Sequence, residues 1–198
     1  MISIMFKDYE PLTHGFDPSS EVSTSKFIRR IDGGFTIELL RSLGSEDIKP
    51  LIHIAQSLVE SFGLKLLATK NDILNYFNPP TTYPFIARHE GHPIGFIIGV
   101  PLEQFANLDW AKNDQNLGKE NTLYTYAYGV MPSYRGKGIA AELKSTYLWW
   151  SKDRGYEYIT GTVRKGISAE MGGEVTLLSS IENWNETGLT FEYYRRKL

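Results

Sequence analysis

Residues 129–141 read Gly-Val-Met-Pro-Ser-Tyr-Arg-Gly-Lys-Gly-Ile-Ala-Ala, the most informative segment of the sequence. A strand pattern, Leu123–Val130, runs into it, and a helix pattern, Ile139–Asp153, follows directly. Glycines let backbone N–H groups approach a ligand closely, and the first turn of a helix offers unpaired N–H donors and a partial positive charge. Arg135 and Lys137 add two full positive charges. The stretch therefore predicts an anion-binding loop suited to phosphate.

Two known phosphate-binding patterns fit this stretch poorly. A P-loop needs four residues between its glycines and a hydroxyl residue after its lysine, whereas six residues separate Gly129 from Gly136 and the residue after the lysine is Gly138. A dinucleotide fingerprint is matched by Gly136, Gly138 and Ala141. However, the next predicted strand ends at Val163 before two basic residues instead of an acid, and the remaining chain is too short for a doubly wound sheet. The sequence therefore disfavours both a P-loop and a dinucleotide-binding fold.

A third pattern, [RQ]-x-x-G-x-[GA], is filled by Arg135, Gly138 and Ala140. The full run Val130-x-Pro132-x-Tyr134-Arg135-Gly136-Lys137-Gly138-Ile139-Ala140 resembles the GNAT superfamily of N-acetyltransferases. The order of predicted elements from Phe35 to Val163 is also similar to that of the family. The resemblance implies an α/β (α+β) fold of the acyl-CoA N-acyltransferase type, with a mixed, mostly antiparallel central sheet and helices on both faces.

The resemblance also implies that the protein binds acetyl-CoA as a cosubstrate. In such proteins the loop amides hold the pyrophosphate, and the preceding strand pairs its main chain with the pantetheine arm. That strand is expected to splay from the next one, Tyr156–Val163, so that the cofactor enters the gap. The residues implied in cofactor binding are Gly129, Val130, Met131, Arg135, Gly136, Lys137, Gly138, Ile139 and Ala140.

The reaction implied is transfer of an acetyl group from acetyl-CoA to a primary amine of a small molecule or a protein. The chain has no cysteine, so we expect direct attack in a ternary complex rather than an acyl-cysteine intermediate. Glu120, just before the tyrosine-rich strand, is the candidate base, acting through water. Tyr128 is the candidate acid because it is close to Val130, and it is expected to share one strand face with Tyr124 and Tyr126.

One departure from the family pattern leaves this function open. The family usually places an acid tyrosine in a helix after the strand Tyr156–Val163, but the segment Gly166–Gly173 supports at most one or two turns. A non-catalytic acyl-CoA sensor or scaffold is therefore the alternative. The polar segment Phe105–Asn121 carries Asp109, Asp114 and Glu120 and would attract a cationic acceptor such as a polyamine, an aminoglycoside or a lysine.

Composition excludes several other classes of protein. The chain of 198 residues has 21 basic and 23 acidic side chains, a net charge of −2, which argues against a nucleic-acid partner. Its four histidines show no zinc pattern, so no metal site is expected. No apolar run approaches the ~18 residues of a membrane span. The apolar N-terminus lacks the features of a signal peptide, so we expect a cytoplasmic protein without a membrane partner.

The expected organisation is an N-terminal extension over residues 1–34 and an acetyltransferase domain over residues 35–198. Within the extension, Met1–Tyr9 and Lys26–Ile31 have the pattern of short strands, and the extension could add strands, cover a sheet edge or serve a homodimer. The tail is expected to form a terminal hairpin, with a helix over residues 185–196 as the alternative. The other predicted elements are a strand at Phe35–Arg41, a helix from Ser45 to Phe62, a short helix at Asp72–Phe77, a hairpin of Tyr83–His89 with Pro93–Val100, and the tail strands Glu174–Trp184 and Leu189–Leu198.

Overall fold

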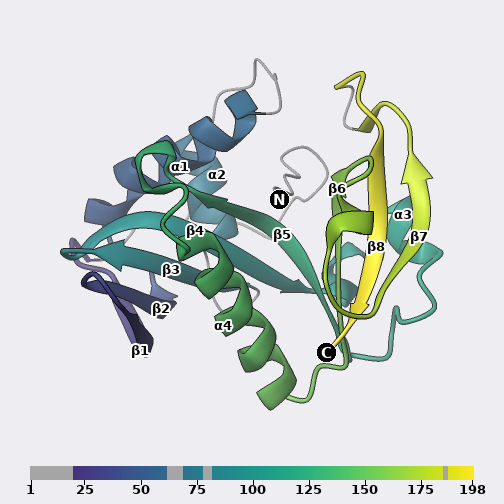
Figure 1. The fold of residues 1–198 in the computed structure, drawn as a ribbon, viewed down its shortest axis with the longest axis horizontal. Helices are drawn as coiled ribbons and strands as arrows, with labels where there is room; N and C mark the ends of the chain where they lie inside the picture. Colours follow the sequence, from purple (N-terminus) through teal and green to yellow (C-terminus); the bar gives the residue numbers. More distant parts are fainter. Residues whose placement is uncertain (1–19, 62–68, 78–81, 185–186) are drawn as a thin grey trace.

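The structure is a computed structural model that describes residues 20–61, 69–77, 82–184 and 187–198. One eight-stranded sheet, in the order β1-β2-β3-β4-β5-β6-β8-β7, runs through these residues (Figure 1). All neighbouring strands are antiparallel except β5 and β6, so the predicted mixed, mostly antiparallel sheet is confirmed. The strands are β1 (Thr24–Ile31), β2 (Phe35–Ser42), β3 (Tyr83–His89), β4 (His92–Pro101), β5 (Thr122–Val130), β6 (Tyr158–Arg164), β7 (Val175–Ile181) and β8 (Phe191–Lys197).

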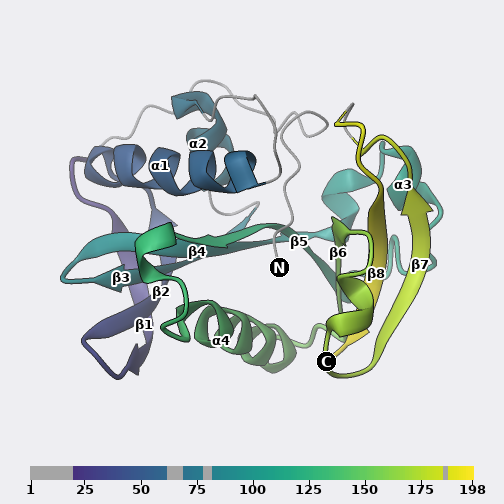
Figure 2. The ribbon, with the colours of Figure 1, turned by 45° about the horizontal axis from the view of Figure 1, so that its top comes forward.

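Helices cover both faces of the sheet, as predicted. Helices α1 (Ser45–Ser61) and α2 (Lys70–Tyr76) lie on one face, and α4 (Ile139–Asp153) lies on the other (Figure 2). The short helix α3 (Asp109–Lys112) and a 3₁₀ turn, η1 (Leu102–Phe105), interrupt the connection from β4 to β5. Two further 3₁₀ turns are η2 (Pro132–Tyr134), after β5, and η3 (Ser168–Glu170), after β6.

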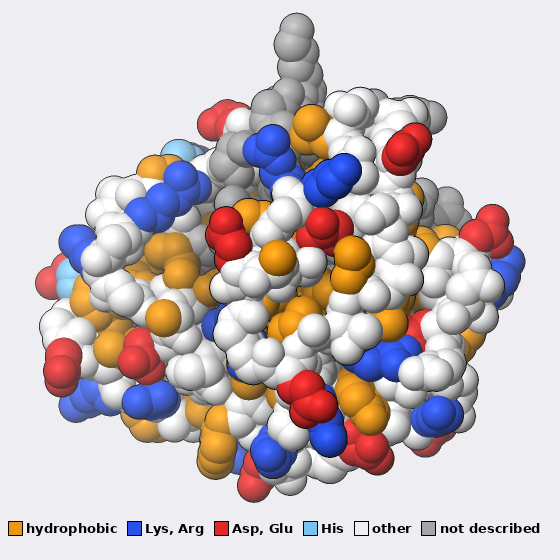
Figure 3. Space-filling model, turned by 45° about the vertical axis from the view of Figure 1, so that its right-hand side comes forward, with side chains coloured by type: hydrophobic (Ala, Val, Ile, Leu, Met, Phe, Trp, Pro, Cys, Tyr) orange, Lys and Arg blue, Asp and Glu red, His pale blue; other side chains and the backbone are white. Residues whose placement is uncertain are grey.

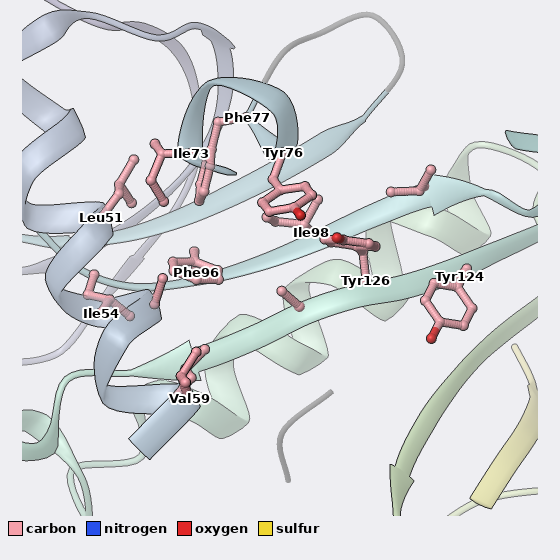
Figure 4. Close-up of a cluster of buried hydrophobic side chains, with 14 of the residues drawn as sticks. Leu51, Ile54, Val59, Ile73, Tyr76, Phe77, Phe96, Ile98, Tyr124 and Tyr126 are labelled. Carbon is pink, nitrogen blue, oxygen red and sulfur yellow. The ribbon is translucent and has the colours of Figure 1, made fainter. Parts of the chain in front are cut away.

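Each face of the sheet buries its own hydrophobic cluster. Apolar residues of α1 recur at helical spacing, and Leu51, Ile54 and Leu58 are fully buried against the sheet together with aromatic residues of β4 and β5 (Figure 4). On the opposite face, Leu143 and Tyr147 of α4 pack onto the sheet. The two clusters fix both helical layers relative to β5, the strand that leads into the glycine loop.

The N-terminus of α1 is held by a buried charged network. The Arg88 guanidinium on β3 donates to both carboxylate oxygens of Asp47 and, at 3.1 Å, to Glu38. Burial alone would lower the pKa of Arg88, but the two carboxylates outweigh burial and raise it. Gly91 of the β3–β4 turn joins the network, because its carbonyl accepts from the same guanidinium at 2.9 Å. The first turn of α1 is therefore tied to the β3–β4 hairpin.

The tail forms the predicted hairpin, and the alternative of a helix over residues 185–196 is wrong. Strand β8 carries residues 191–197 and pairs with β6 on one side and β7 on the other, so its backbone hydrogen bonds are used in two ladders. The predicted strand Lys26–Ile31 is confirmed as β1, which pairs with β2 across a turn at Gly33 and Gly34, both in the left-handed region. Met1–Tyr9 lies outside the described residues. In the described part of the chain, no helix has the length and apolar character needed to cross a membrane.

Candidate functional site

Strands β5 and β6 separate after three residue pairs. They are paired in parallel from Thr122 to Tyr124, opposite Tyr158 to Thr160, and no later pair joins them in the described chain. Beyond this point β6 remains paired with β8 alone as far as Arg164. The two strands therefore diverge toward the end of β5 that leads into the glycine loop (Figure 1), which is the splay predicted from the resemblance. We call the point of separation the vertex.

Tyrosine side chains close the vertex from both faces. On the α1/α2 face the hydroxyls of Tyr124 and Thr162 are 2.6 Å apart and join β5 to β6. On the α4 face the Tyr194 hydroxyl lies beside Gly161 and Thr125, and burial raises the pKa of Tyr194 to about 12. These contacts restrict how far the two strands can be separated.

Strand β5 contains a bulge that changes which face its tyrosines occupy. Ile98 pairs with Ala127 and Gly99 with Thr125, so Tyr126 is an extra residue. Tyr126 therefore packs on the α1/α2 face beside Tyr76 of α2, with ring centroids 4.5 Å apart (Figure 4). Tyr128 packs on the α4 face. The prediction that the three tyrosines of this strand share a face is wrong for Tyr128, because the extra residue reverses the alternation beyond it.

The loop between β5 and α4 presents an open run of backbone amides. Gly136 and Gly138 have φ of 76° and 78°, a region that favours glycine, and a side chain at either position would meet no neighbour within 4 Å. The first backbone hydrogen bond of α4 is donated by the Glu142 amide to the Gly138 carbonyl, at 3.1 Å. The amides of residues 136–141 donate to no other described residue. The resemblance implies that the amides of the Arg135–Ala140 loop hold the pyrophosphate, and those of residues 136–140 are open to a ligand. The Arg135 amide instead donates to the Pro132 carbonyl at 3.2 Å, and the Ala141 amide is a further open donor.

Basic side chains flank these amides. Arg135 and Lys137 are both exposed, and the Lys137 ammonium lies 4.8 Å from the ring centre of Tyr134. The Tyr134 hydroxyl is in turn 3.2 Å from Nδ1 of His89, at the β3–β4 turn. This cation–π contact stabilises the Lys137 ammonium over the Tyr134 ring. Arg135 has no ion-pair partner among the described residues.

Four other residues predicted to contact the cofactor, Gly129, Val130, Met131 and Ile139, pack against or bond to neighbouring elements of the fold. Val130 and Ile139 are buried in the cluster under α4, so their side chains belong to the core. Gly129 faces α1, where an added Cβ would stand 2.1 Å from a methyl group of Leu58. The Met131 amide donates to Ile94 of β4 at 2.8 Å. Any cofactor contact from these positions therefore relies on backbone atoms.

The two candidate proton-transfer residues are not brought together. The Tyr128 hydroxyl donates to the carbonyl oxygen of Ala140, and burial raises its pKa. Glu120 is exposed and lies before the opposite end of β5, where its amide donates to a Glu103 carboxylate oxygen at 3.0 Å. Since a strand rises about 3.3 Å per residue, the part of β5 from Thr122 to Tyr128 separates the two residues by roughly 20 Å along the strand.

Asp114 is a buried structural residue and is not free to attract a cation. Its carboxylate accepts hydrogen bonds from the Tyr193 hydroxyl at 2.6 Å, from the Asn116 amide at 2.8 Å and from the Arg195 guanidinium. The expectation that Asp114 draws a cationic acceptor is therefore wrong, because Arg195 neutralises it from 81 residues away in the chain. Asp109 is exposed but is paired with Lys112 at 2.8 Å.

Charges elsewhere on this side of the molecule are mixed. Lys and Arg side chains are interspersed with Asp and Glu over the face shown in Figure 3. Among the described residues no group of three or more His, Asp or Glu side chains is arranged to hold a metal ion.

A sequence comparison agrees with this fold and this loop. An acetyltransferase (GNAT) family model matches residues 51–168, more than half of the chain, and this span contains β5, the glycine loop, α4 and β6. The chain belongs to the GNAT acetyltransferase family, whose cosubstrate is acetyl-CoA. No curated protein matches the sequence.

Solved structures share the fold at low sequence identity. Ard1 from Thermoplasma volcanium is 16% identical, with a TM-score of 0.60 over 83% of this chain and 98% of that one. The ribosomal-protein-S18-alanine N-acetyltransferase from Escherichia coli is 14% identical, with a TM-score of 0.57 over 82% and 93%. A GNAT family acetyltransferase from Elizabethkingia anophelis with acetyl-CoA bound is 11% identical, with a TM-score of 0.56 over 84% and 100%. These similarities show a common fold and do not identify the acceptor.

Proposed function

We propose that the protein transfers an acetyl group from acetyl-CoA to a primary amine of a small molecule or a protein. The observation that carries this proposal is the run of six amides, in the loop that joins the diverging strand β5 to α4, that donate to no residue the structure describes. Acetyl-CoA would supply the acyl group as a thioester. The family identity makes acetyl transfer the expected chemistry, and the strand geometry supports it.

The residues present fit the cofactor in both charge and shape. The amides of residues 136–141, with Arg135 and Lys137 beside them, would hold the diphosphate. Open space next to Gly136 and Gly138 leaves the backbone accessible. The edge of β5 from Gly129 to Met131, which β6 has left, would pair with the amide groups of the pantetheine arm.

Direct attack by the amine is the proposed route, because the chain offers no cysteine to carry the acyl group. An alkylamine has a pKa of about 10.4, so only about one molecule in 2,500 is neutral at pH 7. The site must therefore favour the neutral amine by desolvation or by a base acting through water. We assign Tyr128 to positioning the loop rather than to proton transfer, because its hydroxyl is bonded to Ala140.

A second candidate function is a non-catalytic acyl-CoA sensor or scaffold. The supporting observation is that Tyr128 and Glu120 lie at opposite ends of β5, and that the single turn η3 stands where the family usually has a longer helix. This reading uses the same loop and the same cofactor, and differs only in the absence of turnover.

Thiol release from acetyl-CoA separates the two functions. The full chain is incubated with acetyl-CoA and a panel of amines that includes polyamines, aminoglycosides, amino acids and peptides with free N-termini or lysines. We expect steady release above the amine-free background with at least one acceptor, and a mass increase of one acetyl group on that acceptor. Saturable binding of acetyl-CoA with no release across the panel would support the sensor and contradict the transferase.

A further inference from the structure

One aromatic side chain attaches the start of the glycine loop to the core. Of the seven residues 132–138, Tyr134 alone is not exposed, and it alone is a member of a hydrophobic cluster, the one under α4. Between Met131 and Ile139, Tyr134 is therefore the residue through which the chain packs against the core. The position of this ring determines where the loop begins.

The Tyr134 ring is held by two aromatic residues at one end of the sheet. Phe35, the first residue of β2, is paired with His89, the last residue of β3, and their ring centres are 4.6 Å apart. The Tyr134 ring is T-shaped to Phe35, with centroids 6.1 Å apart, and lies 5.6 Å from the His89 ring. Its hydroxyl is 3.2 Å from Nδ1 of His89. These contacts fix both the position and the tilt of the ring.

The same ring contacts the middle of the glycine loop through Lys137, whose ammonium lies 4.8 Å above the ring centre. Gly136 and Gly138, on either side of Lys137, have positive φ, and an added Cβ at either would meet no neighbour within 4 Å. Such a Gly-Lys-Gly segment has wide backbone freedom. Its three amides donate to no described residue, so the cation–π contact is the restraint that the described structure places on it.

The hydrogen bonds of the preceding turn do not replace this restraint. In η2 the Tyr134 amide donates to the Met131 carbonyl at 2.9 Å, and the Arg135 amide donates to the Pro132 carbonyl at 3.2 Å. Both bonds are local, so they shape the turn without attaching it to the sheet. Ordering a flexible backbone on binding costs affinity, and an amide run that is already held in place therefore binds an anion more tightly.

We propose that Tyr134 is a positioning residue for the cofactor. Its ring, fixed by Phe35 and His89, holds Lys137 and with it the amides of residues 136–138 in the arrangement that receives the diphosphate. The ring carries this role and the hydroxyl supports it, because Lys137 contacts the ring. This inference rests on the coenzyme A binding of the proposed function and names the residue that prepares the loop for it.

Calorimetric titration of coenzyme A into two variants of the full chain tests the role of the ring. Tyr134→Leu keeps an apolar side chain but removes the ring, whereas Tyr134→Phe keeps the ring and loses only the hydroxyl. We expect coenzyme A to bind at least about fivefold more weakly to Tyr134→Leu, and within about twofold of the wild type to Tyr134→Phe. Equal affinity in all three proteins would overturn the proposal.

Tyr156→Leu is the matched control for a general loss of packing. Tyr156 is also partly buried against the cluster under α4, where its ring is T-shaped to Tyr83 at 6.5 Å, but it lies beyond the C-terminal end of α4. This variant should lose stability in urea denaturation, as Tyr134→Leu does, and keep its affinity for coenzyme A. An affinity loss as large as that of Tyr134→Leu would reduce Tyr134 to a structural residue and overturn its positioning role.

Lys137→Met shows whether Tyr134 acts through Lys137. Lys137 is exposed, so folding should be preserved, and loss of the ammonium should weaken coenzyme A binding severalfold. In the Lys137→Met background, Tyr134→Leu should cause a smaller fold-loss of affinity than in the wild type, because the ring then has no ammonium to hold. Equal fold-losses in the two backgrounds would overturn the positioning role and leave the proposed function intact. Absence of coenzyme A binding to the wild type would overturn both.

Discussion

The hydroxyl of Tyr128 donates a hydrogen bond to the carbonyl oxygen of Ala140 and so ties strand β5 to the first turn of α4. Both ends of the glycine loop are thereby held in one geometry. Tyr128→Phe removes this bond alone, and we expect it to lower the free energy of unfolding by about 1 kcal/mol. Urea denaturation measures this loss. Coenzyme A affinity should fall as well, because the amides are less firmly oriented; unchanged stability and unchanged affinity would contradict the role assigned to Tyr128.

Gly129 is required by the packing of α1 on β5. An added Cβ would lie 2.1 Å from Leu58, so Gly129→Ala must displace the helix or the strand. We expect a loss of about 1–3 kcal/mol in the free energy of unfolding, as for other overpacked core sites. Leu58→Ala leaves a cavity and is destabilising by itself, by about 2–5 kcal/mol. The double variant should be more stable than the sum of the two losses predicts, and strict additivity would show that the two residues do not compete for space.

The pair of hydroxyls at the vertex, Tyr124 and Thr162, can be tested by a double-mutant cycle. Tyr124→Phe and Thr162→Val each remove one partner of a buried 2.6 Å hydrogen bond. We expect a coupling energy of about 1 kcal/mol in urea denaturation. A coupling energy near zero would mean that this bond does not join β5 to β6 in solution.

Lys144 on α4 gives the protein a distinctive pH dependence. Burial, reinforced by the nearby charge of Arg196, lowers the pKa of Lys144 to about 8. Between this value and the ordinary value of about 10.4, the unfolded chain binds one more proton than the folded chain, so stability rises with pH over this interval. Solvent screening at this partly exposed side chain limits the rise to about 1 kcal/mol.

Lys144→Met tests this effect, since it removes the titrating group and keeps an apolar stem. The variant should be more stable than the wild type at pH 7, and thermal melts between pH 8 and 10.5 should lose the part of the pH dependence that Lys144 contributes. A variant that is less stable at pH 7, with an unaltered pH profile, would show that the ammonium is well solvated in the folded protein.

Much of this architecture is encoded in short-range sequence patterns. The helix at Ile139–Asp153 has the predicted bounds because its apolar spacing and flanking glycines mark both ends. The glycine loop could be predicted because positive φ and close backbone approach leave a recognisable residue pattern. These features depend on neighbours within one or two helical turns.

The features that could not be predicted depend on contacts between distant parts of the chain. The bulge at Tyr126 adds one residue to a strand whose composition is otherwise regular. Regular alternation predicts Tyr128 on the same face as Tyr124 and Tyr126, but the extra residue turns it to the α4 face. Asp114 appears as a loop charge in the sequence, and its partner Arg195 is brought to it only by the β6–β8 pairing. The contact between Gly129 and Leu58 likewise requires α1 to be packed on the sheet.

Calorimetric titration of coenzyme A into the wild type and two glycine variants tests whether the loop amides hold the diphosphate. Gly138→Ala, in the loop, and Gly155→Ala, after the far end of α4, replace glycines with φ of 78° and 85°, neither of which has a neighbour within 4 Å of an added Cβ. Backbone strain of about 1 kcal/mol should therefore affect the stability of both equally. We expect an affinity for coenzyme A at least about tenfold weaker in Gly138→Ala and unchanged in Gly155→Ala. Equal affinities in both variants and the wild type, or no binding of coenzyme A to the wild type, would show that the loop amides do not hold the diphosphate.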